Sequence, residues 1–174
     1  MPVIPPPEHD VFAPNGWARA ELLEPASQKA LDRAVSWAAD TRWDSVRTPH
    51  LFMGLLSAGD RRVFDWCRMF GADPDSLILQ FAALFTRSRE AKRPIVRLNR
   101  EFFSENAIRV LRTAHERMLR YERDTIGVSD LLIALFTPNE SIVAGCFADA
   151  GLPSERLAAM AAAAEERKSG PESR

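Results

Sequence analysis

Apolar residues recur along most of this chain at the spacing of amphipathic helices. Between residues 25 and 41 they fall at every third or fourth position, as expected where one helix face packs on a core. No segment alternates with the two-residue period of a strand, so the pattern predicts an all-α protein. The predicted helices cover 25–41, 48–56, a third segment ending at Gly71, 74–85, 104–121, 129–136, 140–150 and 153–166.

Capping residues indicate where several of these helices begin and end. Thr48-Pro49 and Asp73-Pro74 each combine a side chain that can cap a helix with a proline at the first helical position. Ser104 is a third expected N-cap, and Gly71 fits the left-handed residue that follows a helix C-terminus. The stretches 49–56 and 129–136 are almost wholly apolar and predict buried helices.

The second half of the chain repeats the first without a gap. Placing Leu131 on Leu51, a shift of 80 residues, aligns the halves continuously from Ser27 to Ala83. Because the matching positions are mainly apolar and the polar ones differ, we predict a tandem duplication of a four-helix unit, with eight helices and a pseudo-two-fold axis. Further identical pairs are Leu31 with Leu111, Ala34 with Ala114, Asp44 with Asp124, Leu55 with Leu135, Val63 with Val143, Gly71 with Gly151 and Leu77 with Leu157.

The repeats divide the chain into an arm, a body and a tail. In the Pro-rich arm, Phe12, Trp17, Leu22 and Leu23 are expected to dock on the body, while fraying is expected from Glu165 onward. The predicted boundaries are an N-terminal arm over 1–23, a first repeat over 24–85, a basic connector over 86–103, a second repeat over 104–166 and a disordered tail over 167–174.

Composition fits an ordinary globular protein and excludes several classes. The chain has 174 residues, 46% of them hydrophobic, and its 23 basic and 24 acidic side chains give a formal net charge of −1. This balance argues against wholesale nucleic-acid binding. The longest apolar run is too short to cross a bilayer, and the first residues lack a signal peptide, so a cytoplasmic protein is expected. Two isolated cysteines, Cys67 and Cys146, fit buried thiols.

Sequence motifs for catalysis are missing. No glycine-rich phosphate loop precedes a lysine, and His115-Glu116 is followed by Leu119 where a zinc-binding helix would need a second histidine. No serine lies in a nucleophile elbow, and neither cysteine has an activating neighbour in sequence. We therefore expect a protein that is not an enzyme, with no cofactor and no bound metal. The four tryptophans are expected in the core or at its edge.

The segment Thr48-Pro49-His50-Leu51-Phe52-Met53-Gly54-Leu55-Leu56 resembles the T-E-H-L-L-L-G-L-L signature of the Clp N-terminal domain, the repeat domain at the front of Clp-family unfoldase ATPases. The segment 25–31 is similar to the family's T-P-E-A-x-x-A-L opening, and Gly71 and Gly151 fall at its conserved turns. The resemblance covers about Glu24 to Glu166. It implies a domain that recruits substrates and adaptors to an ATPase ring and has no catalytic activity of its own.

The sequence after Glu166 contains no ATPase module, so the resemblance suggests a free-standing member. Such a protein would act as an adaptor, a decoy or a substrate-recruitment protein for a Clp unfoldase or protease in protein quality control. The expected partner is therefore a Clp-family ATPase, its adaptor or its substrates. Association with a membrane is not expected. The alternative is a helical nucleic-acid-associated regulator that uses the basic connector at 87–100, which carries a net charge of +4 over 86–103.

ClpC-type members of the family bind phosphoarginine through a threonine at each repeat start and the glutamate of each T-E-H motif. In this chain the two threonine positions are Glu24 and Ser104, and the two glutamate positions are Pro49 and Ser129. A phosphate would be repelled by Glu24, so phosphoarginine recognition is expected to be lost or much weakened. The neighbouring His50 and Asp130 are expected to organise helix starts. These six positions are the predicted protein-binding residues: Glu24, Pro49, His50, Ser104, Ser129 and Asp130.

Overall fold

Eight α-helices build the part of the chain that the computed structural model describes, residues 10–87, 93–137 and 141–168. No strand ladder is present among these residues, and the all-α duplicated fold expected from the sequence is confirmed. The helices are α1 (Pro25–Asp40), α2 (Thr48–Ser57), α3 (Arg61–Met69), α4 (Pro74–Phe85), α5 (Glu105–Arg120), α6 (Val128–Phe136), α7 (Ile142–Asp149) and α8 (Ser154–Lys168), with short 3-10 helices η2 (Ala20–Leu22) and η3 (Arg100–Phe102).

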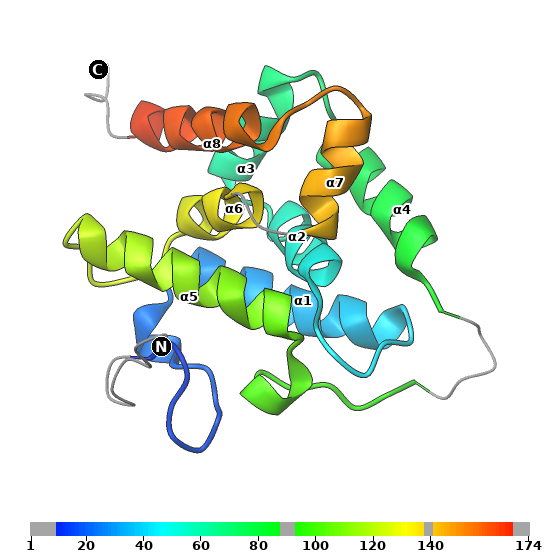
Figure 1. Cartoon of the computed structure of the whole chain (residues 1–174), viewed down its shortest axis with the longest axis vertical. Helices are drawn as coiled ribbons and strands as arrows, with labels where there is room; N and C mark the ends of the chain where they lie inside the picture. The colour runs from blue at the N-terminus through cyan, green and yellow to red at the C-terminus, as the bar shows by residue number, and fades with distance from the viewer. Residues whose placement is uncertain (1–9, 88–92, 138–140, 169–174) are drawn as a thin grey trace, which may run out of the picture.

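The two apolar helices α2 and α6 lie at the centre of the molecule. In Figure 1, α1 and α5 lie on one side of this pair, α3 and α8 on the opposite side, and α4 and α7 at one end. Each central helix packs against the first and fourth helix of its own repeat. This arrangement explains why α2 and α6 are apolar on nearly every face, whereas α1 and α5 are amphipathic.

Aromatic rings from both repeats share one core. Phe52 of the first repeat contacts Phe136 and Phe147 of the second, with ring centroids 6.2 and 5.7 Å apart. Trp66 is fully buried among them, and its indole Nε1–H donates a hydrogen bond to the Leu157 carbonyl at 3.0 Å. The two halves are therefore packed as one hydrophobic unit.

Gly54 permits close packing of α2 against α1. An added Cβ there would lie 2.3 Å from the Ala30 carbonyl oxygen and 2.9 Å from the Ala34 backbone nitrogen. Both atoms belong to the backbone of α1 and cannot rotate away. The equivalent position in the second repeat is Ala134, so only the α1 to α2 contact requires glycine.

Short backbone bridges run from each repeat to the other and follow the pseudo-two-fold axis. The Ile126 N–H donates to the Leu22 carbonyl at 2.6 Å, and the Val46 N–H donates to the equivalent Phe102 carbonyl, also at 2.6 Å. The extended residues Leu23 and Phe103 complete these bridges. The entry to each repeat is thus held by the loop before the second helix of the other repeat. We refer to them as the crossed bridges.

The N-terminal arm and the connector pack on each other as well as on the body. The Ala18 N–H donates to the Leu98 carbonyl at 3.0 Å, and the Arg100 N–H donates to the Gly16 carbonyl at 2.7 Å. Phe12 is 1% exposed and meets Phe103 edge to face, as the expected docking of the arm requires. Trp17, by contrast, is 44% exposed.

Several predicted boundaries need correction. Thr48 is the first residue of α2 and Arg47 is its N-cap, so Thr48 does not cap this helix. The prediction of a frayed end from Glu165 is wrong, because α8 continues to Lys168 and the Glu165 carboxylate is ion-paired with Arg117. The predicted tail therefore begins inside α8, and residues 169–174 lie outside the described part of the chain. Glu140, the expected start of the seventh helix, also lies outside it.

Candidate functional site

The fold gathers the six predicted binding residues at two places related by the pseudo-two-fold axis. Glu24 lies at the start of α6, next to Ser129 and Asp130. Ser104 lies at the start of α2 and lines the same groove as Pro49 and His50. Each place therefore combines the beginning of one repeat with the second helix of the other, an arrangement that the crossed bridges fix.

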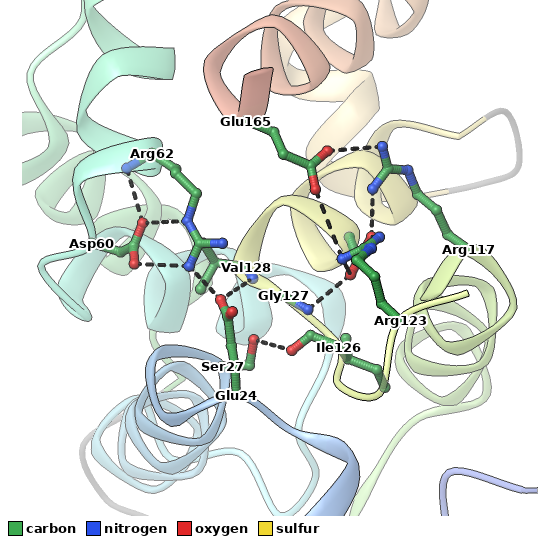
Figure 2. A network of polar contacts seen from close by, with 11 residues as sticks. Glu24, Ser27, Asp60, Arg62, Arg117, Arg123, Ile126, Gly127, Val128 and Glu165 are labelled. Atoms are coloured by element: carbon green, nitrogen blue, oxygen red, sulfur yellow. Dashed lines mark hydrogen bonds and ion pairs between the residues drawn. The ribbon is translucent and has the colours of Figure 1, made fainter. Parts of the chain in front are cut away.

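The first place, which we call the charged groove, has a volume of about 480 Å³ and is lined almost wholly by charged side chains. The Glu24 carboxylate forms an ion pair with Arg62 and accepts a hydrogen bond from the Val128 backbone N–H at 3.0 Å. Figure 2 shows these contacts. The residues that line the charged groove are Glu24, Arg62, Glu122, Arg123, Asp124, Thr125 and Glu165.

Arg62 neutralises the carboxylates around it. Its guanidinium also pairs with Asp60, whose carboxylate accepts the Arg62 backbone N–H at 2.9 Å and caps α3. Burial opposes the charge of Arg62, but the hydrogen bonds with Asp60 and Glu24 outweigh it and raise the pKa of this guanidinium above its ordinary value. The negative charge of Glu24 is therefore paired within the protein.

Asp130 belongs to a second ionic cluster beside the first. Its carboxylate is fully buried, accepts the Gly127 N–H at 2.8 Å and pairs with Arg117 and Arg123. Glu165 of α8 closes the cluster by pairing with Arg117 at 3.0 Å (Figure 2). A carboxylate this deeply buried and fully paired serves the fold, because it has no face directed to a ligand.

The second place, which we call the apolar groove, has nearly the same volume, about 470 Å³, and the opposite character. Ile142 is 54% exposed at its edge, and Trp43 is fixed by a hydrogen bond from its indole N–H to the Phe85 carbonyl. The Ser104 hydroxyl accepts the Ala107 N–H at 3.2 Å and caps α5. The residues that line the apolar groove are Trp43, Arg47, Thr48, Pro49, His50, Phe85, Ser104, Glu105, Asn106 and Ile142.

His50 organises the start of α2, as expected from the sequence. Its Nδ1 accepts the Arg47 backbone N–H at 3.0 Å, which leaves Nε2 protonated and 3.0 Å from the Thr41 hydroxyl. Burial, and next the positive charge of Arg47, lower the pKa of His50 to about 4. The imidazole is therefore neutral at physiological pH. Asp130 accepts the equivalent N–H at the start of α6.

The two grooves are lined by equivalent positions whose chemistry has diverged. Trp43, Phe85 and Ile142 of the apolar groove correspond to ion-paired side chains in the charged groove. One groove is thereby occupied by its own ion pairs, while the other presents apolar surface. The equivalent pairs are Trp43 with Arg123, Phe85 with Glu165, Ile142 with Arg62, Ser104 with Glu24 and His50 with Asp130.

Sequence reasoning placed no site on Trp43, Phe85 or Ile142, the residues that give the apolar groove its character. The signal that could have found them was the same shift of 80 residues, which pairs each with a charged residue in the other repeat. The four tryptophans differ widely in burial: Trp66 is in the core, whereas Trp43 lies at the surface of the groove.

Trp43 is also a platform for two arginines. The guanidinium carbons of Arg47 and Arg87 lie 4.5 and 4.1 Å from the centroid of its ring. Arg87 belongs to the basic connector, of which residues 88–92 lie outside the described part. Arg93 of the same connector pairs with Asp40 at 2.9 Å. Two described residues of the connector, Arg87 and Arg93, thus contact the body.

Neither cysteine has the lowered pKa of an activated thiol. Burial, with a smaller effect of Asp73, raises the pKa of Cys67 to about 12, and burial raises the pKa of the half-buried Cys146. A raised pKa leaves a thiol protonated and weakly nucleophilic. Among the described residues no three histidine, cysteine or carboxylate side chains converge as metal ligands. None of the described helices is long and apolar enough to span a membrane.

Comparisons with known proteins agree with this fold. The family model for the Clp repeat (R) N-terminal domain matches residues 23–150. The fold is similar to the N-terminal domain of the chaperone ClpD from Arabidopsis thaliana, with 19% identity, a TM-score of 0.65 and coverage of 86% of this chain and 96% of that one. A comparison with curated protein sequences returns no significant match.

Two further solved domains have the same fold. The Hsp104 N-terminal domain from Candida albicans is 13% identical, with a TM-score of 0.61 over 80% of this chain and 88% of that one. The N-domain of ClpV from Vibrio cholerae is 19% identical, with a TM-score of 0.59 over 82% of this chain and 84% of that one. At these identities the likeness shows the fold alone.

Proposed function

The chain belongs to the Clp repeat N-terminal domain family, and from that premise we propose that it binds proteins and catalyses no reaction. Domains of this family are interaction modules of Clp ATPases that bind adaptors and substrates. In the proposed role the protein serves a cytoplasmic Clp unfoldase or its protease as an adaptor, a decoy or a substrate-recruitment protein in protein quality control.

The observation that carries this proposal is the apolar groove. Trp43, Phe85 and Ile142 present apolar surface at a concave place of about 470 Å³, which suits the side chains of a bound peptide segment. Exposed apolar surface lined by a few polar groups is typical of sites for protein recognition. The charged groove lacks such surface because Arg62 and Glu24 already satisfy each other.

Phosphoarginine recognition is proposed to be lost at both places. A guanidinium is bound most strongly by a carboxylate in bidentate geometry, and the two positions that would supply it are Pro49 and Ser129, both buried. The Glu24 carboxylate cannot replace them, because it is held by Arg62 and by the Val128 N–H.

A pull-down of the intact chain from its native cells tests the proposed role. Wild type should retain a Clp ATPase, its protease or its adaptors at low and at moderate salt. Ile142→Asp should lose them, since it puts a charge into the apolar groove. Leu119→Asp is the matched control, because Leu119 is 55% exposed on another face. Recovery of none of these partners by wild type would contradict the proposal.

Calorimetric titration with free phosphoarginine tests the second part. Wild type should give no measurable heat of binding. Pro49→Glu, which restores the family carboxylate beside Ser104, is the variant most expected to gain binding. Saturable binding by wild type would show that recognition persists by another geometry.

A further inference from the structure

We infer that the apolar groove recognises acidic peptide segments, in which a carboxylate lies next to a large apolar side chain. The inference rests on the proposed protein-binding function and specifies the chemistry of the partner. Its evidence comes from the charged groove, from three helix ends and from the arginines on Trp43.

The charged groove shows which group is bound at the start of a central helix. There the Glu24 carboxylate accepts the Val128 N–H at 3.0 Å, at the first residue of α6. The equivalent N–H in the apolar groove belongs to Thr48, the first residue of α2, and Ser104 stands where Glu24 would be. Among the described residues no carboxylate accepts the Thr48 N–H. A carboxylate supplied by a partner fits the position that Glu24 fills in the other repeat.

Three helices begin at the apolar groove. Thr48 and Ile142 are the first residues of α2 and α7, Glu105 is the first residue of α5, and all three line the groove. The partial positive charge of each helix N-terminus favours an anion. In the charged groove, backbone N–H groups at the equivalent ends of α3 and α6 already donate hydrogen bonds to the carboxylates of Asp60, Asp130 and Glu24.

Two arginines add full positive charges at this place. Arg47 and Arg87 lie on the Trp43 ring, and neither is paired with a carboxylate of the described residues. A guanidinium stacked on an aromatic face keeps its in-plane N–H groups available for a carboxylate. Against them the groove lining has one acid, Glu105. The charge of the site is therefore complementary to an acidic partner.

The apolar lining supplies the second half of the specificity. Ile142, Pro49 and the Phe85 side chain surround the space beside these arginines, so an aliphatic or aromatic side chain can be buried there. Nucleic acid fits less well. The Trp43 ring is already in contact with two guanidiniums, and its indole N–H already donates to a carbonyl. The apolar lining also makes no favourable contact with a phosphate backbone.

Selection from a random-peptide display library, with the whole chain as bait, tests the inference. Selected peptides should be enriched in aspartate and glutamate next to large apolar residues. Representative peptides should bind Arg47→Glu/Arg87→Glu at least about ten-fold more weakly, the loss expected for about 1.4 kcal/mol of charge-assisted hydrogen bonding. Arg120→Glu/Arg156→Glu, which makes the same charge change on exposed residues of α5 and α8, should bind normally.

Each other outcome overturns the inference in a distinguishable way. Selected peptides without acidic enrichment, or equal weakening in both double variants, would leave the protein-binding function intact and refute the acidic preference. No selected peptide, together with a successful pull-down, would place the partner elsewhere on the molecule. Binding of a single-stranded oligonucleotide that requires Arg47 and Arg87 would indicate a nucleic-acid site instead.

Discussion

His50 and Asp130 show how two residues of different chemistry can hold the same position in a duplicated fold. Each accepts the backbone N–H three residues before it, at 3.0 and 2.8 Å, and so fixes the start of a central helix. A neutral imidazole needs no counter-ion when it is buried, whereas the Asp130 carboxylate requires Arg117 and Arg123. The ionic cluster of the second repeat thus follows from one acidic residue.

The His50 imidazole should make stability depend on pH. Its folded pKa of about 4 lies below the ordinary value of 6.5, so the unfolded chain binds more protons between these values and stability falls as the pH falls through this window. From pH 7 to pH 5 the loss from this group is about 2 kcal/mol. Urea unfolding should show a smaller loss in His50→Asn, which keeps a hydrogen-bond acceptor. Equal losses in both proteins would argue against a neutral buried His50.

Gly54→Ala should destabilise the protein by about 2 kcal/mol, since the new methyl group would collide with the backbone of α1. The gain in helix propensity from alanine, about 1 kcal/mol, is too small to offset a contact of 2.3 Å. Ala134→Gly at the equivalent position is the control and should cost only about 1 kcal/mol. Thermal or urea unfolding gives both values. If Gly54→Ala left the free energy of unfolding unchanged, α1 and α2 would be able to move apart without loss of stability.

At the scale of helices, the Asp130 cluster joins α5, α6 and α8. Arg117 is on α5, Asp130 on α6 and Glu165 on α8, and Arg123 in the loop before α6 contacts both acids. The C-terminal turns of α8 are held by these ion pairs as well as by apolar packing of Ala161 and Ala164.

Asp130→Asn should destabilise the fold by about 3 kcal/mol, because it leaves two partly buried guanidiniums without their shared carboxylate. The amide oxygen can still accept the Gly127 N–H, so the loss of stability measures the contribution of the Asp130 charge. Glu165→Gln removes a charge that is 27% exposed and should cost about 1 kcal/mol or less. Urea unfolding of the two variants compares these losses. Similar values for both would show that burial of Asp130 adds nothing.

The sequence predicted the helices well because their apolar periodicity and capping residues are local signals. It failed at the end of α8, where Glu165 is paired with Arg117 and Arg123, which are more than about 40 residues away in sequence, so no local pattern reveals the contact. The six positions predicted from the resemblance lie at the two grooves, and their role in binding stays a prediction. Trp43, Phe85 and Ile142 became candidates only when the fold brought them to one groove.

At the scale of the whole molecule, divergence of the two equivalent grooves leaves only one of these two with an apolar lining. Calorimetry with an acidic peptide from the display selection should give one bound peptide per chain. Ile142→Ala should weaken binding about ten-fold, while the same change at the equivalent Arg62 should leave affinity unchanged. Circular dichroism would check that both variants fold. Two equal sites, or a loss in Arg62→Ala, would show that the charged groove also binds.

The crossed bridges have a consequence for how the two halves depend on each other. Leu22 pairs with Ile126 and Phe102 pairs with Val46, so each bridge has one partner in the first half of the chain and one in the second. Two fragments produced by cutting the connector should therefore associate to regain these hydrogen bonds and the shared aromatic core. The same reciprocal pairing is what two separate copies of a single repeat would form as a symmetric dimer, so one polypeptide here has the internal geometry of a two-subunit assembly.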